Sequence, residues 1–115
     1  MDINSIKTAL QAANNAPFQA QRASGCGRAY VVISIPKKLE DGSRNAARTK
    51  TLNLIKKACG EMGLLYLTEV YGCGKVPGIY IGYDNADGRA LAKSVVFAET
   101  LRQHGIPCYD EAVGD

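Results

Sequence analysis

The chain has 115 residues, of which 46% are hydrophobic and 22% charged, and its formal net charge is +3. This length supports one ordinary hydrophobic core and is too short for two, so we expect a single domain. The apolar runs are far shorter than a membrane span, and the first residues lack the basic start of a signal peptide. We therefore expect a cytoplasmic protein without a membrane partner. A net charge this small does not by itself indicate nucleic-acid binding.

The first segment has an amphipathic helical pattern. Ile3, Ile6 and Leu10 recur at helical spacing, Asp2 or Asn4 can cap the start, and Pro17 ends the pattern. The sequence therefore predicts a helix over residues 1–17 that precedes the core motif and packs on it.

Residues 28–113 follow the order strand, helix, strand, strand, helix, strand. Strands are predicted over 28–35, 64–71 and 78–83 and from Ile106, with one helix capped by Ser43 and another running from Asp87 to a stop at Gly105. This is the ferredoxin-like βαββαβ order. We predict an α+β sandwich with an antiparallel sheet in the order 4-1-3-2, both core helices on one face, and the extra N-terminal helix.

The face of the sheet opposite the helices carries tyrosines in this prediction. Strand alternation assigns Tyr30, Tyr66 and Tyr80 to it, and three such rings could form a platform for base stacking, as in RNA-recognition motifs. The expected basic-Gly-aromatic run is absent, however. The favoured alternative is that the N-terminal helix covers this face with its apolar stripe, and a homodimer through the sheet or the helix is a further alternative.

Positive charge is concentrated in one part of the chain. Residues 36–57 hold seven basic and two acidic side chains, whereas residues 99–115 hold one basic and four acidic ones. The predicted topology brings the end of the first strand, the start of the first core helix and the turn between strands two and three to one edge. We predict a basic edge there that binds nucleic acid or a partner; its residues are Lys37, Lys38, Arg44, Arg48 and Lys75, with Lys56 and Lys57 continuing along the helix. A solvated charged face without a ligand is the alternative.

No residue pattern indicates catalysis, a metal or a cofactor. The four cysteines, Cys26, Cys59, Cys73 and Cys108, form no C-x-x-C pair and are expected to be reduced thiols. The alternative is a metal site formed by Cys73, Cys108 and His104. Asp84 and Asp87 are typical of turn and capping residues, so we predict that the protein is not an enzyme.

Two segments carry a resemblance to a known class of proteins. They are Cys26-Gly27-Arg28-Ala29-Tyr30-Val31 and Phe97-Ala98-Glu99-Thr100-Leu101-Arg102-Gln103-His104-Gly105-Ile106. They resemble the Cys-Gly-x-Ala-aromatic-Val strand and the Phe-Ala-x-x-Leu-Arg-x-x-Gly-Ile helix end of short, largely uncharacterised proteins of bacteriophages and prophages. The resemblance covers both ends of the core. It implies an origin in a mobile element, whose small domains commonly bind nucleic acid or disable host machinery.

The combined prediction is a small non-enzymatic phage or mobile-element module in the host cytoplasm. It engages nucleic acid or a nucleoprotein through the basic edge. The alternative is a protein-binding inhibitor of a host defence system, of the anti-CRISPR type. The sequence leaves the ligand and the oligomeric state open.

Overall fold

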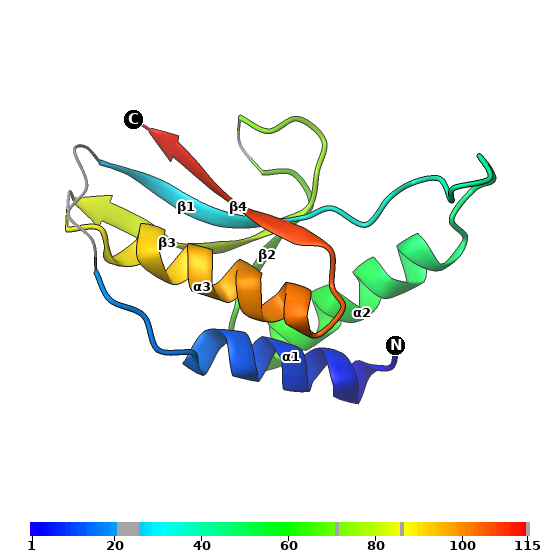
Figure 1. The fold of residues 1–115 in the computed structure, drawn as a ribbon, viewed down its shortest axis with the longest axis horizontal. Helices are drawn as coiled ribbons and strands as arrows, with labels where there is room; N and C mark the ends of the chain where they lie inside the picture. Colours follow the sequence, from blue (N-terminus) through cyan, green and yellow to red (C-terminus); the bar gives the residue numbers. More distant parts are fainter. Residues whose placement is uncertain (21–25, 71, 86, 115) are drawn as a thin grey trace.

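The computed structural model describes residues 1–20, 26–70, 72–85 and 87–114 and shows three helices packed beside a four-stranded sheet (Figure 1). The elements in chain order are α1 (Ile3–Asn15), β1 (Cys26–Ile33), α2 (Ala47–Met62), β2 (Leu65–Leu67), β3 (Gly78–Asn85), α3 (Arg89–Gln103) and β4 (Cys108–Gly114). The predicted α+β class is thus confirmed, with every predicted helix and strand present.

The sheet is antiparallel and open, with the strand order β2-β3-β1-β4. Read from the β4 edge, the order is β4-β1-β3-β2. β1 lies in the centre and pairs with β3 and β4 along almost its whole length. β2 pairs only through Leu65, Tyr66 and Leu67, so it is shorter than the strand predicted over 64–71, whose last residue lies outside the described residues.

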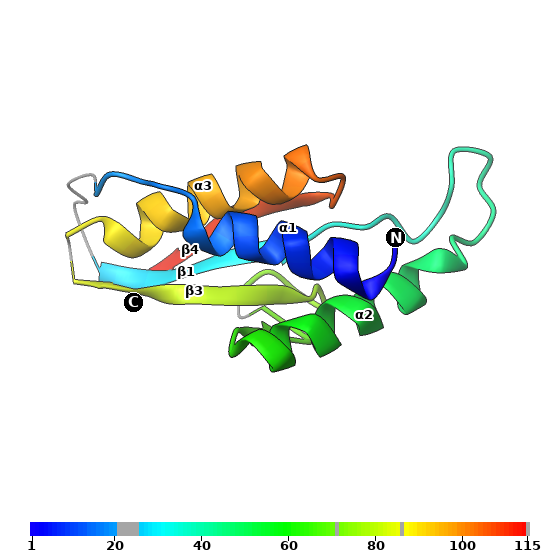
Figure 2. The same ribbon diagram turned by 90° about the horizontal axis from the view of Figure 1, so that it is seen from below.

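All three helices lie on one side of the sheet, which we call the helix face. Fully buried side chains from the sheet, such as Val31 and Ile79, pack there with Ile55 of α2 and Phe97 of α3. α1 contributes Ile6, Ala9, Leu10 and Ala13 to the same core. Figure 2 shows α1 lying between α2 and α3, which closes the gap between them. The expectation that this helix would cover the other face of the sheet is therefore wrong.

Local hydrogen bonds explain where α1 begins and where α3 ends. The Asp2 carboxylate accepts the Ser5 N–H at 2.8 Å, and the Ser5 hydroxyl oxygen accepts the Asp2 N–H, which completes a capping box. α3 ends at Gln103, and Gly105 just beyond it has a φ of 84°, which is accessible to glycine and lets the Ile106 N–H reach the Leu101 carbonyl at 3.0 Å. The predictions of Asp2 as a cap and Gly105 as a helix stop are confirmed.

The start of α2 differs from the prediction. The Ser43 hydroxyl and N–H both donate to the Asp41 carboxylate, so the side chain is occupied in a turn rather than in capping the helix. Backbone bonds from Leu39 N–H to the Ser43 carbonyl and from Asn45 N–H to the Lys37 carbonyl fold residues 37–45 into a hairpin-like segment. The helix consequently begins at Ala47, without a side-chain cap.

The opposite side of the sheet, which we call the open face, carries a second and smaller apolar cluster. Its buried members are Tyr30, Val32 and Val70, and Tyr80 packs against them. Val70 belongs to the connection from β2 to β3, and the described parts of this connection, residues 68–70 and 72–77, fold back over the strands (Figure 1). Gly78 permits this approach, because a Cβ there would lie 2.5 Å from the Val70 side chain and 2.7 Å from the Val31 carbonyl oxygen.

Two irregularities change which side chains face which way. β3 has a bulge, since Ala29 pairs with Gly82 but Tyr30 pairs with Tyr80. Gly82 therefore lies toward α3, with a Cβ position 3.1 Å from Ala90, whereas simple alternation predicted the other face. In β2 the alternation is reversed, so that Tyr66 packs on the helix face and Leu67 on the open face.

Candidate functional site

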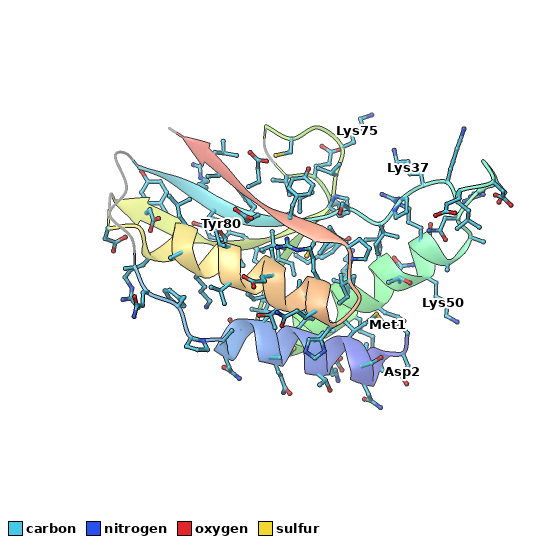
Figure 3. The ribbon with its side chains drawn as sticks, viewed as in Figure 1. Met1, Asp2, Lys37, Lys50, Lys75 and Tyr80 are labelled. Carbon is cyan, nitrogen blue, oxygen red and sulfur yellow. The ribbon has the colours of Figure 1, made fainter. Side chains whose placement is uncertain are left out.

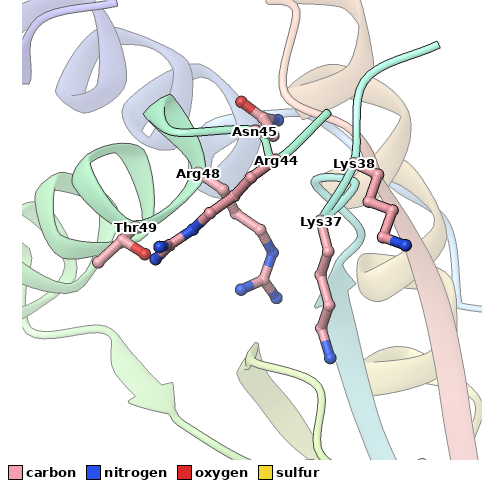
Figure 4. A pocket seen from close by; sticks show the side chains of 6 residues that line it. All are labelled: Lys37, Lys38, Arg44, Asn45, Arg48 and Thr49. Atoms are coloured by element: carbon pink, nitrogen blue, oxygen red, sulfur yellow. The ribbon is translucent and has the colours of Figure 1, made fainter. Parts of the chain in front are cut away.

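A hollow lies on the surface where β1 leads into α2. It measures about 430 Å³, and we call it the basic hollow; it is lined by Lys37, Lys38, Arg44, Asn45, Arg48 and Thr49. Figure 4 shows Lys37, Lys38 and Arg44 on the segment between β1 and α2, while Arg48 and Thr49 come from the first turn of α2. Four of its six residues are cationic, so the hollow favours an anion.

Hydrogen bonds hold the walls of the basic hollow in place. The Arg48 Nε donates to the Ile35 carbonyl at 3.0 Å, which leaves the terminal nitrogens of the guanidinium for another partner. Asn45 Nδ2 donates to the Pro36 carbonyl at 2.9 Å, and the backbone N–H of Asn45 donates to the Lys37 carbonyl. An isolated antiparallel β-bridge, formed by the backbones of Lys38 and Arg44, closes the hairpin-like segment. The two lysines are thus carried by a braced backbone beside the first turn of α2.

A second hollow adjoins the first and shares Arg48 and Thr49 with it. It measures about 300 Å³, and we call it the tyrosine hollow; its lining residues are Arg48, Thr49, Leu52, Asn53, Lys56, Tyr66, Thr68, Lys75 and Pro77. Burial raises the pKa of the Tyr66 phenol, Cys59 adds to this effect and Arg48 opposes it. The phenol is therefore a neutral hydrogen-bonding group at neutral pH.

The two hollows form a continuous positive surface. Neither is lined by an acidic side chain. Among the described residues an ion pair joins Lys7 to Glu61 at 3.0 Å, and it involves none of the cations in the hollows. Acidic residues lie close by: Glu40 and Asp41 are in the turn of the hairpin-like segment, where Asp41 is bound to Ser43, and Glu69 lines a further hollow together with Lys75. Within the two hollows themselves, an anionic ligand would meet cations alone.

Most of the predicted basic edge is brought together, although its members are far apart in sequence. Lys37, Lys38, Arg44 and Arg48 share the basic hollow, and Lys56 and Lys75 join Arg48 in the tyrosine hollow. Figure 3 shows Lys37 and Lys75 extending along the same margin of the molecule, with Lys50 pointing away from it. Lys57, which continues along α2, lines neither hollow, and neither does His104.

The predicted tyrosine platform does not form. Tyr66 packs on the helix face and not beside the other two rings. Tyr30 is only 4% exposed, and its ring lies 5.6 Å from that of Tyr80 at a tilt of 59°. Of these three rings, Tyr80 alone is both half-buried and on the open face.

The hollows also contain polar residues that the sequence analysis did not select. These are Asn45, Thr49, Asn53 and Thr68. A signal for two of them was present, because Thr49, Asn53 and Lys56 recur at helical spacing on one face of α2. No corresponding signal marks Thr68, whose position depends on how β2 pairs.

Cys73 and Cys108 lie on opposite faces of the sheet. Cys108 is buried in the helix-face core, where its thiol donates to the Ala98 carbonyl at 3.3 Å, whereas Cys73 packs against the open-face cluster. The sheet separates them, so the considered cluster of Cys73, Cys108 and His104 is not formed. Across the described part of the chain, no three His, Cys, Asp or Glu side chains come close enough to hold a metal ion.

Comparisons with protein-family models, with curated proteins and with solved structures find no match for this chain. Of the helices in the described ranges, none combines the length and the apolar character needed to cross a bilayer.

Proposed function

We propose that this protein is a small binding module, without catalytic activity, that engages nucleic acid or a nucleoprotein through the two adjoining hollows. Six cations would contact the phosphates: Lys37, Lys38, Arg44, Arg48, Lys56 and Lys75. The observation that supports the proposal most is the continuity of the two hollows, whose cations come from the segment after β1, from α2 and from residues 68–77. Phosphates spaced along a strand match such a row of separated charges better than one small anion does.

The arrangement of the cations supports a phosphate ligand in particular. Arg48 is fixed through its Nε, so its planar fork is preorganised for an anion, and lysines on either side supply mobile point charges. The start of α2 lies at the basic hollow and lacks a side-chain cap, which leaves backbone N–H groups of its first turn directed toward the same region.

The remaining parts of the proposal concern fold and origin. We propose that the fold is ferredoxin-like, with α1 as an addition, on the strength of the element order and the antiparallel sheet. The two segments that resemble phage and prophage proteins support an origin in a mobile element. Such a module would act on nucleic acid in the cytoplasm of its host.

The test measures binding of the purified protein to random single- and double-stranded DNA and RNA by fluorescence anisotropy, from about 50 mM to about 200 mM salt. We expect an affinity that falls steeply with salt. The double variant Lys37→Glu/Lys38→Glu should weaken binding by at least tenfold and should lower the slope of log affinity against log salt by about one for each lysine. No binding by the native protein to any of the four nucleic acids would refute the proposal.

A matched control is available on the same helix. Lys50 and Lys57 are seven residues apart, so they share one face of α2, and neither lines a hollow. Lys50→Glu/Lys57→Glu changes the net charge by the same amount as Lys37→Glu/Lys38→Glu. It should leave binding within about threefold of the native protein, because distant exposed charges are screened. An equal loss in both double variants would show that net charge, and not this site, governs the affinity.

Exposed apolar side chains favour a second candidate, a protein-binding inhibitor of a host defence system. Leu39, at the hairpin-like segment beside the basic hollow, is 50% exposed, and Leu65 on the edge strand β2 is 55% exposed. A surface that mixes cations with apolar residues is typical of protein interfaces. Such an inhibitor would bind its partner at moderate salt, and Leu39→Ser would weaken that binding while leaving free nucleic acid unbound.

A further inference from the structure

We infer that the ligand is a single strand of nucleic acid, with one base held against Tyr66 in the tyrosine hollow and the adjacent phosphates held by the basic hollow. This rests on the proposed function and names the form of nucleic acid that the site takes. The juxtaposition of one aromatic ring with cations in the same hollow and in the adjoining one distinguishes this region from an ordinary basic surface.

The position of Tyr66 provides the first step. Its side chain packs against the helix-face core and also lines the tyrosine hollow, so the core supports the ring from behind. Its backbone is fixed by pairing between β2 and β3, where Tyr66 lies opposite Ile79. A ring held in this way contacts a flat ligand at little conformational cost, because it has few rotamers left to lose.

The neighbours of Tyr66 provide the second step. Arg48 and Thr49 lie between the two hollows, and Lys56 and Lys75 belong to the tyrosine hollow itself. A strand that passes from one hollow to the other would therefore meet cations in both hollows, including the one that holds the ring. The Asn53 amide and the Thr68 hydroxyl, in the same hollow, can donate to or accept from the edge of a base.

The concave shape provides the third step. In a duplex the bases are stacked on one another and only their edges reach the grooves, so a duplex cannot place a base inside a hollow without unstacking it. A single strand has unstacked bases, which proteins hold on aromatic rings beside positively charged grooves. The tyrosine hollow, at about 300 Å³, offers this combination, whereas a duplex would contact the rim alone.

The experiment compares three ligands of equal length: an oligothymidine of about 12 nucleotides, its abasic counterpart, and a duplex of the same length. We expect the native protein to bind the oligothymidine about tenfold more tightly than the abasic strand, because the abasic strand keeps the phosphates and removes the bases. It should also prefer the oligothymidine to the duplex. An oligouridine in place of the oligothymidine distinguishes RNA from DNA as the source of the strand.

The decisive variants are Tyr66→Leu and its matched control, Tyr80→Leu. Both tyrosines are half-buried and lie in neighbouring strands, but Tyr80 is on the open face, away from the hollows. Tyr66→Leu should lower the affinity for the oligothymidine to that for the abasic strand and leave the abasic affinity unchanged. Tyr80→Leu should change neither. Tyr66→Phe, which keeps the ring, should retain at least a third of the native affinity.

The outcomes separate the inference from the proposed function. Equal affinity for the oligothymidine and the abasic strand, a preference for the duplex, or no effect of Tyr66→Leu would overturn the inference and leave a phosphate-binding module. No binding to any nucleic acid would overturn both. If Tyr66→Leu does not fold, as judged by its thermal unfolding, the comparison of ligands on the native protein and on Tyr66→Phe still decides.

Discussion

The two faces of the sheet are closed in different ways. On the helix face, three helices bury a core of large side chains, among them Leu10, Phe97 and Leu101, which are fully inaccessible. On the open face, no helix is present within the described residues, and residues 68–77 cover a cluster whose buried members are Tyr30, Val32 and Val70. One face is closed by regular elements and the other by a connection.

This difference explains where the candidate site lies. α2 is held by α1 and by β2, while its first turns extend past the end of the sheet, together with residues 37–45 (Figure 1). Residues 68–77 fold over the open face and also carry Lys75 to the same end. The hollows therefore form where the two kinds of closure meet, and the core that fixes α2 also fixes Arg48 and Lys56.

The largest expected effect comes from opening the helix face. Leu10→Ala removes a fully buried side chain of α1 and should lower the free energy of unfolding by about 2–5 kcal/mol. Val70, on the open face, is smaller and 1% exposed. Val70→Ala removes two buried carbon groups and should lower the free energy of unfolding by about 1.5 kcal/mol. Urea unfolding of both variants measures the difference. A larger loss in Val70→Ala would mean that residues 68–77, and not α1, close the more important core.

Backbone packing on the open face is tested by a glycine. Gly78→Ala places a Cβ 2.7 Å from the Val31 carbonyl oxygen, and because this neighbour is backbone it cannot move aside cheaply. We expect a loss of about 1–3 kcal/mol in unfolding free energy, the usual range for overpacking.

The matched control for Gly78→Ala is Gly60→Ala in α2. A Cβ at Gly60 meets nothing within 4 Å, and alanine favours the helix, so this variant should gain about 0.5–1 kcal/mol. If both alanine variants are equally stable, the close packing of Val70 and the Val31 carbonyl around Gly78 is wrong.

A buried carboxylate on the helix face provides a smaller and pH-dependent effect. Asp84 is 1% exposed, and its oxygens accept the Ala90 and Leu91 N–H groups at 2.8 and 3.0 Å, which joins the end of β3 to the start of α3. Burial alone would raise the pKa of Asp84, but hydrogen bonds, the strongest of them from Leu91 and Ala90, together outweigh burial and lower the pKa below 3.8. Asp84→Asn should cost about 1–2 kcal/mol near neutral pH, as the loss of a helix cap does.

The sign of the pH dependence follows from the lowered pKa. The stabilisation from the Asp84 carboxylate is complete above its unfolded value near 3.8 and is lost as the pH falls through the lower folded value. The difference in unfolding free energy between native protein and Asp84→Asn should therefore shrink in acid. Asp110→Asn, at an exposed position on β4, should change the stability by less than about 0.5 kcal/mol. A difference that grows as the pH falls would contradict the assignment.

Patterns that depend on neighbours in sequence predicted this fold well. The Asp2 cap, the helix stop at Gly105 and the strands β1 and β3 follow from local spacing and turn chemistry. The basic edge was also predictable in large part, because the order of the elements already brings Lys37 and Lys75 to one end of the sheet.

What could not be predicted depended on contacts between distant segments. The apolar stripe of α1 shows that the helix is buried, but the same stripe fits the open face or the gap between α2 and α3. Leu65-Tyr66-Leu67 has apolar side chains on both sides, so alternation does not define its face, and Tyr66 was assigned to the wrong one. The bulge in β3 has no local signal, since Ile81 is as suited to regular pairing as to an extra residue. Ser43 is predicted as the cap of α2 because serine is a common N-cap residue, but in the structure its hydroxyl and N–H donate to the Asp41 carboxylate instead.

The smallest effect concerns the thiols, which report on each face separately. Burial raises the pKa of Cys59 to about 12 and of Cys108 to about 11, and both lie in the helix-face core. Burial also raises the pKa of Cys73, but its side chain is half-buried at the open face. Because the thiolate is the nucleophile and must be reached, iodoacetamide should modify Cys73 before the other two, as measured by peptide mass spectrometry.

The destabilised variants turn this labelling into a test of independence. Leu10→Ala should accelerate modification of Cys59 and Cys108 more than that of Cys73, because it opens the helix-face core, and Val70→Ala should do the reverse. Equal acceleration of all three thiols in both variants would show that the faces open together in one global transition. Selective acceleration would show that residues 68–77 can lift from the sheet while the helices stay packed, so that Lys75 moves relative to Arg48 and the width of the tyrosine hollow varies without unfolding.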